Sequence, residues 1–400
     1  MPHPTLTANS TTAPAGLHNG LVWLMALSCG LVVANIYYNQ PLLAAIGHDF
    51  GVKDSQASLI ATATQAGYTL GMLLLVPLGD KFERKRFMLW LLGGVALCLA
   101  GAALAPTFWV LAVASVLIGL CSAVPQLLLP MAAHLAPEAD RGRILGRIMS
   151  GLLLGILLSR TVSGFVGAHF GGWRVVFGGA SGLMLALGAL LAWQLPRNYP
   201  SFRGSYAELM RSLGTLAREL PALRRAALVG ATAFAGFSVF WTTLAFYLKS
   251  PAYGYGSDVA GLFGLVGAAG ALAAPWAGKT ADVRGPRYAI TLGVGLALAA
   301  YLVLGVAGGW LVGMVLGVLL LDVGVQAAHT SNQTLIFSLR PEARSRLNTV
   351  YMTGYFTGGS LGSLAGGLAW THYGWPGVCL VGGAFVALAL AVHWGYARGR

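Results

Sequence analysis

Long apolar stretches, separated by short polar connections, run through almost the whole chain. Most are close to the ~20 residues that an α-helix needs to cross the ~30 Å hydrocarbon core of a bilayer. Alternating segments of ~10 residues, typical of an outer-membrane barrel, are absent. Because lipid cannot hydrogen-bond exposed backbone groups, we expect helices to span the membrane. The pattern predicts an all-α membrane protein with twelve transmembrane helices, near residues 20–46, 57–79, 87–105, 108–133, 146–168, 173–195, 226–249, 257–278, 288–307, 310–336, 347–370 and 374–396.

Composition supports lipid as the solvent for most of the chain. Of 400 residues, 56% are hydrophobic and 9% are charged, whereas a soluble domain carries about 25% charged residues. The 56 glycines fit this interpretation, because small residues let membrane helices approach closely. The cysteines lie inside apolar stretches without metal-ligand spacing, and we interpret them as small core residues outside any disulfide framework: Cys29, Cys98, Cys121 and Cys379.

The polar segments divide the chain. Residues 1–19 are rich in Thr, Ala and Pro and lack Lys and Arg, which predicts a short disordered cytoplasmic tail and not a signal peptide. Residues 196–225 form the longest polar segment, expected to be a cytoplasmic central loop between two six-helix halves at 20–195 and 226–396. Residues 397–400 are a second cytoplasmic tail.

Basic residues fix the expected orientation. Lys and Arg concentrate in the loops after the second, fourth, sixth, eighth and tenth spans and in the C-terminal tail, whereas the opposite loops hold only Lys53, Arg174 and Lys249. The positive-inside rule then places both termini in the cytoplasm, in a multi-pass protein of a bacterial inner membrane. The formal net charge of +13 is therefore a topology signal, with contacts to the lipid bilayer, and does not indicate nucleic-acid binding.

The two halves repeat each other at an offset near 203 residues. Equivalent positions keep the same or similar residues: Arg141 and Arg344, Gly151 and Gly354, Gly155 and Gly358, Gly164 and Gly367, and His169-Phe170-Gly171 and His372-Tyr373-Gly374. Asp80 and Asp282 correspond at an offset of 202. Such repeats are typical of transporters in which two halves rock about a site at the membrane midplane.

The loop after the second span resembles the signature loop of the major facilitator family, G-x-L-x-D-R-x-G-R-R. Residues 77–85 read Pro-Leu-Gly-Asp-Lys-Phe-Glu-Arg-Lys, with Val76 and Glu83 at the two Gly positions, and the copy at 278–287 keeps both glycines. The resemblance implies a cytoplasmic gate in which the Asp caps a helix and pairs with Arg of neighbouring helices. The gate residues would be Asp80, Arg84, Lys85, Asp282, Arg284, Arg287, Arg141 and Arg344. The alternative is a solvated turn that only carries the topology signal.

Residues 34–43, Ala-Asn-Ile-Tyr-Tyr-Asn-Gln-Pro-Leu-Leu, also resemble the first span of a twelve-helix bacterial subgroup usually grouped with drug:proton antiporters. Two positions depart from the antiporter pattern. Ser115 replaces the Arg of the fourth-span motif R-x-x-x-G, although Gly119 is kept. Ile156 replaces the Pro of the fifth-span motif G-x-x-x-G-P. The direction of transport therefore stays open.

Two charged residues lie deep inside predicted spans, where charges are costly and usually functional. Arg160 and Asp322 correspond to Ser363 and Gly119 in the repeat, so the shared scaffold requires neither charge. We hypothesise that they pair across the cavity in one state, and that protonation or substrate binding releases the pair and permits rocking. The alternatives are a static pair that fixes helix packing, and direct binding of an anionic substrate by Arg160.

Further polar and aromatic residues are candidates for lining the cavity. Asp322, Gln326, His329 and Gln333 fall on one face of the tenth span, where His329 is either a proton relay or a hydrogen-bonded neutral side chain. The remaining candidates are Asn35, Tyr38, Asn39, Gln65, Gln126, Trp241, Tyr351 and Tyr355. Each alone is more often a packing residue than a contact to a ligand. Such a lining suits a neutral or weakly charged amphipathic solute.

Enzymatic chemistry finds no support in the sequence, which lacks a Walker loop, a cluster of metal-ligating residues and a nucleophile with a nearby base. We therefore expect no cofactor and a proton gradient as the energy source. The sequence predicts a monomeric secondary active transporter that exports drug-like or metabolite molecules with proton coupling. The alternative is a facilitator or importer of a small organic anion bound at Arg160.

Overall fold

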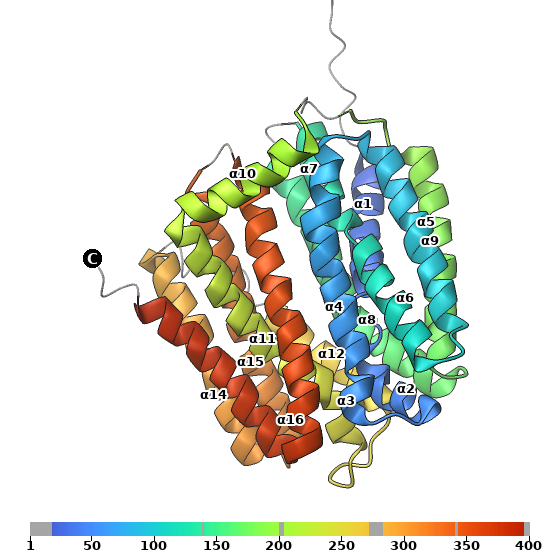
Figure 1. Ribbon diagram of the computed structural model, residues 1–400, viewed down its shortest axis with the longest axis vertical. Coiled ribbons are helices and arrows are strands. Elements are labelled where there is room, and N and C mark those ends of the chain that lie inside the picture. Colours follow the sequence, from blue (N-terminus) through green and yellow to red (C-terminus); the bar gives the residue numbers. More distant parts are fainter. Residues whose placement is uncertain (1–17, 138–139, 200–203, 272–282, 341–342, 396–400) are drawn as a thin grey trace, which may run out of the picture.

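The computed structural model describes residues 18–137, 140–199, 204–271, 283–340 and 343–395. Within these ranges the chain consists of helices and their connections, without a strand. Figure 1 shows the long helices side by side, the early ones (blue to green) on one side of the bundle and the late ones (yellow to red) on the other. The helix α10 (Tyr206–Glu219) lies across one end.

The early group contains the helices that precede α10: α1 (Asn19–Ala34), η1 (Gln40–Leu42), α2 (Leu43–Phe50), α3 (Asp54–Ala57), α4 (Leu59–Leu70), η2 (Gly71–Leu75), η3 (Val76–Asp80), α5 (Arg84–Ala103), α6 (Phe108–Cys121), α7 (Val124–Leu135), α8 (Arg141–His169) and α9 (Trp173–Gln194). The late group follows α10: α11 (Pro221–Lys249), α12 (Ser257–Ala271), α14 (Pro286–Ala307), α15 (Leu311–Phe337) and α16 (Arg344–Gly395).

The helices have the length and surface of membrane spans. Among the described residues, nine helical segments are long and apolar enough to cross a bilayer, and Asn19–Ala34 and Ser257–Ala268 are shorter apolar helices. The 52-residue α16 contains a kink at Gly374, with φ 61° and ψ −152°, at the start of the last predicted span. Large apolar side chains such as Trp90, Leu97 and Val306 are exposed. Apolar exposure on this scale marks a surface that contacts lipid, and the chain is a multi-pass membrane protein.

The first predicted span is not one continuous helix. The sequence predicts a helix over 20–46, but α1 ends at Ala34, residues 35–39 form turns, and the chain resumes with η1 and α2. Pro41 accounts for the break, because proline has no N–H and its ring clashes with the carbonyl four residues earlier. The N–H groups of Gln40 and Leu42 bond to carbonyls three residues back, at Tyr37 and Asn39. Discontinuous helices of this kind form binding sites in transporters.

The central polar segment is more ordered than the sequence predicts. The capping box of Ser205 and Glu208 begins α10 by satisfying backbone donors at its N-terminus. The side chains of Leu209, Leu213 and Leu216 form its buried face. The next span, α11, begins at Pro221, before the predicted boundary at residue 226. Sequence analysis missed both features because the apolar positions of α10 are sparse among charges.

Repeated glycines bring neighbouring helices into close contact. A Cβ atom on Gly155 of α8 would overlap backbone atoms of Gly30 on α1. Its repeat equivalent, Gly358 of α16, faces the backbone of Ala231 on α11 in the same way. Equivalent glycines of the two repeats therefore make the same kind of close contact, because small residues allow helix backbones to meet.

Candidate functional site

Arg160 on α8 is enclosed by side chains from two segments that are distant in sequence, the broken first span and α11. It is 1% exposed, and its Nε donates a 2.7 Å hydrogen bond to Oε1 of Gln40 in the broken first span. The guanidinium carbon lies 4.7 Å from the ring centroid of Tyr37, 5.8 Å from that of Phe237 and 4.1 Å from that of Trp241. Cation–π contacts of this kind stabilise a desolvated cation by about 2 kcal/mol or more. The break caused by Pro41 thus supplies two of the groups around the charge.

Asp322 on α15 is the acidic neighbour of this cluster, and it is 7% exposed. Arg160 and Asp322 attract each other electrostatically, but no nitrogen of Arg160 lies within 4.0 Å of a carboxylate oxygen of Asp322. Arg160 Nη2 and Asp322 Oδ2 are both buried without a hydrogen-bond partner. The two residues singled out in the sequence are thus neighbours, and in this state they form no direct ion pair.

Trp241 on α11 connects the two charges. Its ring stacks on the Arg160 guanidinium, and its indole N–H interacts with the Asp322 carboxylate at longer range than a standard hydrogen bond. Gly267 on α12 adjoins both partners, because a Cβ there would lie 2.9 Å from Asp322 Oδ1 and 3.1 Å from Trp241 Cζ2. Gly264, one turn earlier, faces the Cβ of Arg160 in the same way, at 3.1 Å. The glycine face of α12 therefore lets the charged side chains share one small volume.

A neutral polar cluster occupies the place that corresponds to Arg160 in the repeat. Gln65 on α4 donates a 3.0 Å hydrogen bond to Ser363 on α16 and accepts one at 3.4 Å from Ser238 on α11. Thr242 donates to the same Ser363 hydroxyl at 2.9 Å. All four side chains are buried. This cluster joins early and late helices through side-chain hydrogen bonds.

Aromatic rings form a continuous path between Trp241 and His329 on α15. Ring centroids are 6.0 Å apart for Trp241 and Phe237, 5.4 Å for Phe237 and Phe234, and 4.0 Å for Phe234 and Tyr355. Tyr355 lies 4.6 Å from the His329 ring, and Nδ1 of His329 is 3.1 Å from the hydroxyl of Tyr351. The predicted residues Trp241, His329, Tyr351 and Tyr355 are thus brought together.

Other predicted cavity residues make local contacts. Asn39 donates a 2.9 Å hydrogen bond to Thr64, and Asn35 contacts the sulfur of Met184 at 3.4 Å. Gln126 donates to Tyr68 at 3.4 Å, Gln333 donates to Asn348 at 3.3 Å, Tyr38 is buried, and Gln326 is half-buried. These residues face protein and not lipid, but the structure does not group them around Arg160.

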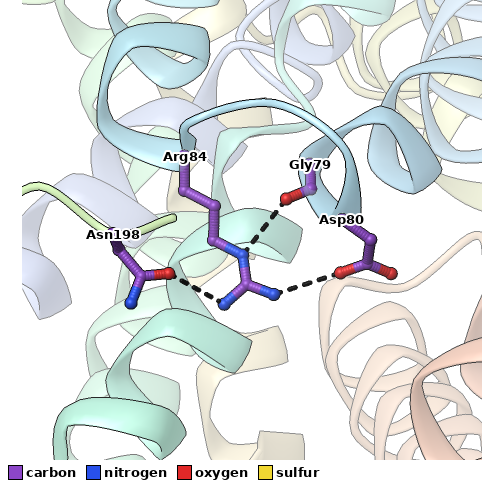
Figure 2. Close-up of polar contacts among 4 residues, drawn as sticks. All are labelled: Gly79, Asp80, Arg84 and Asn198. Atoms are coloured by element: carbon purple, nitrogen blue, oxygen red, sulfur yellow. Dashed lines mark hydrogen bonds and ion pairs between the residues drawn. The ribbon is translucent and has the colours of Figure 1, made fainter. Parts of the chain in front are cut away.

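The predicted gate loop is organised by Arg84, as Figure 2 shows. Its guanidinium donates to the carbonyl of Gly79 at 3.2 Å, to Oδ1 of Asp80 at 3.1 Å and to Oδ1 of Asn198 at 3.2 Å. The residue that caps α5 is Glu83 and not Asp80, because the Glu83 carboxylate accepts the N–H groups of Lys85 and Arg86. Negative charge at a helix N-terminus is favourable, so Glu83 stabilises the turn from which Arg84 extends.

Among the described residues, the gate candidates from other loops do not join this loop. Arg141 and Arg287 are exposed, Arg284 contacts Tyr288 at 2.8 Å, and Arg344 reaches the carbonyl of Phe337 at 3.5 Å. Asp282 lies outside the described residues. The resemblance implied that Asp80 pairs with Arg of neighbouring helices, and in this state Asp80 pairs with Arg84, the first residue of α5.

Sequence reasoning missed several residues of the site, namely Tyr37, Gln40, Phe237, Ser363 and Asn198. Tyr37 lies within the broken stretch and Gln40 directly after it, and Pro41 was available as a signal of this break in the sequence. Phe237 is four positions from Trp241 on α11, the spacing that places two side chains on one helix face. Asn198 carried no recognisable signal, because an amide in a polar loop has no fixed partner in sequence.

Comparison with known proteins agrees with this architecture. The family model of the Major Facilitator Superfamily matches residues 25–363. The uncharacterised transporter YgaY of Escherichia coli K12 is 44% identical over 383 residues, covering 94% of this chain and 96% of its own. The probable transporter SCO4007 of Streptomyces coelicolor is 35% identical over 394 residues, covering 97% and 91%. A probable sugar efflux transporter of Helicobacter pylori is 26% identical over 381 residues, covering 92% and 93%.

Solved structures show the same fold at low sequence identity. A bacterial homologue of the human lysosomal transporter Spinster, inward-facing and unoccupied, has a TM-score of 0.78 at 15% identity, with 94% of this chain and 96% of that chain covered. The nucleoside transporter NupG has a TM-score of 0.76 at 12% identity, covering 94% and 99%. The chain therefore belongs to the Major Facilitator Superfamily and is a membrane transporter, not an enzyme.

Proposed function

We propose that the protein is a secondary active transporter of the bacterial inner membrane, with twelve spans in two six-helix halves at 20–195 and 226–396. Reciprocal packing supports the two halves. Gly164 of α8 meets the backbone of Ser257 on α12, and its repeat equivalent Gly367 of α16 meets the side chain of Ser58, just before α4. Each half thus contacts the other through equivalent helices. The basic loops place both termini in the cytoplasm.

The observation that carries the proposal is the position of Arg160. This cation of the first half is buried against Trp241 and Phe237 of the second half, while its Nη2 remains unpartnered. A charge held between two halves changes its surroundings whenever they move apart. Such a group suits a solute site that is exposed alternately to the two sides of a membrane within one monomeric chain.

Contacts between the halves support a state that is closed at the outer end. Trp370 of α16 donates a 2.7 Å hydrogen bond to Asp54 of α3, and Thr161 of α8 donates at 2.9 Å to the carbonyl of Gly261 on α12. At the opposite end, the Asp80 loop is bound through Arg84 to Asn198 of the central segment, and not to the second half. Rocking would exchange these contacts for a closed cytoplasmic gate.

Proton coupling is proposed for Asp322. Burial disfavours an ionised carboxylate and a nearby guanidinium favours it, so a change in the separation of Arg160 and Asp322 changes the proton affinity of Asp322. His329, linked to this region by the aromatic path, is proposed as a proton relay. Export as the direction is supported by the relatives named as sugar efflux transporters.

The test is uptake into inside-out vesicles or proteoliposomes with an imposed pH gradient, comparing wild type with Asp322→Asn and Arg160→Ala. The exposed pair at the cytoplasmic end offers matched controls, Asp140→Asn and Arg143→Gln. We expect gradient-driven accumulation in wild type and in the controls, and its loss in both site variants. Accumulation that persists in Asp322→Asn and Arg160→Ala would refute the coupling, and accumulation that never responds to pH would refute proton dependence itself.

A second candidate function is a facilitator or importer of a small organic anion bound at Arg160. The specific observation in its favour is the unpartnered Nη2 of Arg160, together with the absence of an ion pair to Asp322. Counterflow of a labelled organic anion without any pH gradient separates the two functions. A facilitator exchanges the anion in Asp322→Asn at the wild-type rate, whereas the proton-coupled transporter does not concentrate its solute in that variant.

A further inference from the structure

Three buried polar atoms next to one another have no hydrogen-bond partner: Nη2 of Arg160, Nε1 of Trp241 and Oδ2 of Asp322. Buried polar groups are nearly always hydrogen-bonded, so each exception needs an explanation. One of the three atoms is a cationic donor, one a neutral donor and one an anionic acceptor. A molecule that bonded to these atoms and also neutralised both charges would carry an anionic group and a cationic group.

The two charged side chains contact the same residue, Trp241, and form no ion pair with each other. Trp241 places the face of its ring 4.1 Å from the Arg160 guanidinium carbon and directs its N–H toward Asp322. No Arg160 nitrogen lies within 4.0 Å of the Asp322 carboxylate. Gln40 holds Arg160 from the other side through Nε. The cation and the anion are therefore separate poles, one at the face and one at the N–H edge of the same aromatic ring.

A ligand with a single charge fits this arrangement poorly. An anion bound to Arg160 would approach the carboxylate of Asp322, and a cation bound to Asp322 would approach the guanidinium. Like charges in a low-dielectric site repel strongly. A zwitterion places a carboxylate against Arg160 and an ammonium against Asp322, and it carries no net charge into the membrane. The rings of Tyr37, Phe237 and Trp241 favour an apolar or aromatic remainder.

We propose that Arg160 and Asp322 are the two poles of one binding site for a small zwitterion with an apolar or aromatic part. The ligand carboxylate bonds to Nη2 of Arg160, and the ligand ammonium bonds to Oδ2 of Asp322. Arg160 is enclosed in this state, so the ligand enters when α11 moves relative to α8. The inference rests on the proposed function and names its substrate class.

Equilibrium binding in detergent or nanodiscs, followed by quenching of tryptophan fluorescence or by calorimetry, tests the site without any gradient. Two zwitterions with different charge separation serve as probes, L-phenylalanine and 4-(aminomethyl)benzoate. Each is compared with its two singly charged analogues: phenethylamine and 3-phenylpropionate for the first, benzylamine and benzoate for the second. We expect at least one zwitterion to bind about tenfold or more tightly than both of its analogues, since each lost charge-assisted hydrogen bond leaves a buried partner unsatisfied.

The variants assign each pole. In Arg160→Gln the zwitterion should bind no more tightly than its amine analogue. In Asp322→Asn it should bind no more tightly than its carboxylate analogue. The control variants Arg143→Gln and Asp140→Asn should keep the wild-type affinities. If neither zwitterion binds wild type more tightly than its singly charged analogues, including the case in which nothing binds, the proposal is overturned. A zwitterion preference that both site variants retain also overturns it. Zwitterion binding without gradient-driven transport would refute the proton coupling and leave the site intact, so the two failures are distinguishable.

Discussion

Gln65 on α4 donates a hydrogen bond to Ser363 on α16, 298 residues later in the chain, at a distance of 3.0 Å. Ser363 is the repeat equivalent of Arg160, and the offset of 202 that relates Asp80 to Asp282 places Gly267 at the position of Gln65. The interface between α4 and α16 is therefore closed by the side-chain amide of Gln65 and the hydroxyl of Ser363. At the equivalent interface, a glycine leaves room beside a buried arginine for the carboxylate of Asp322.

Replacing Gln65 by Met should weaken closure of the outer end. The variant keeps the volume but removes the hydrogen bonds to Ser363 and Ser238, each of which contributes about 0.5–1.5 kcal/mol. Thiol labelling of Ser58→Cys, a buried position beside Gly367, should become several-fold faster in a background without the native cysteines. Thr69→Val on the same helix is the control, because Thr69 bonds only within α4. Unchanged labelling in Gln65→Met would show that this bridge does not hold the halves together.

Arg160→Lys should fail to replace arginine although it keeps the positive charge. Lysine has no planar guanidinium to stack on Trp241. Its single ammonium group also cannot bond to Gln40 and direct a separate N–H donor to a ligand, as the guanidinium can. Loss of a desolvated cation–π contact of about 2 kcal/mol corresponds to more than tenfold in affinity. Initial transport rates at low substrate concentration measure the effect, with Arg143→Lys as the matched control at an exposed ion pair. Wild-type rates in Arg160→Lys would mean that only the charge matters.

The sequence predicts the class of fold well because the long apolar stretches follow directly from burial in lipid, and the repeat separately indicates a transporter built from two related halves. Arg160 and Asp322 could be selected for the same reason, since a charge inside an apolar span has few structural explanations. Their relation could not be predicted. Whether the two charges touch depends on the ring of Trp241, and packing between three helices leaves no periodic signal.

The break in the first span shows a second limit of the sequence. The apolar pattern continues across residues 35–39, so it predicts an unbroken helix, and only Pro41 indicates otherwise.

The gate loop shows a third limit of the sequence. Its motif identified Asp80 and Arg84, but Asn198, the other side chain that Arg84 binds, lies 114 residues beyond Arg84. Local patterns identify chemical types, whereas partners from distant loops depend on the tertiary fold.

Gly155→Ala should destabilise the fold, because a Cβ at this position overlaps backbone atoms of Gly30 and the two helices must separate. Overpacking in a close-packed interior typically costs about 1–3 kcal/mol. Gly146→Ala, on the same helix with open space around the added methyl, should be neutral or stabilising by about 0.5–1 kcal/mol. Thermal unfolding of the two variants in one detergent compares them directly. Equal midpoints would contradict the close contact between α1 and α8.

Asp49→Asn should reveal a pH-dependent contribution at the outer end of the bundle. Arg174 hydrogen-bonds the Asp49 carboxylate, with a further 3.1 Å bond from Nε1 of Trp173, and lowers the pKa of Asp49 below its ordinary 3.8. Ionised Asp49 therefore stabilises the folded state, fully at a pH well above 3.8, and this stabilisation is lost as the pH falls through the lowered pKa.

The size of this effect should be small, because the side chains of Arg174 and Asp49 are 42% and 45% exposed, and solvent screens exposed ion pairs. Thermal midpoints of wild type and Asp49→Asn, measured from pH 7 to pH 3, should differ at neutral pH and converge at the acidic end. In an Arg174→Gln background the same substitution should lose most of its effect at every pH. A difference that grows as the pH falls would reverse the sign of the linkage and exclude Arg174 as its cause.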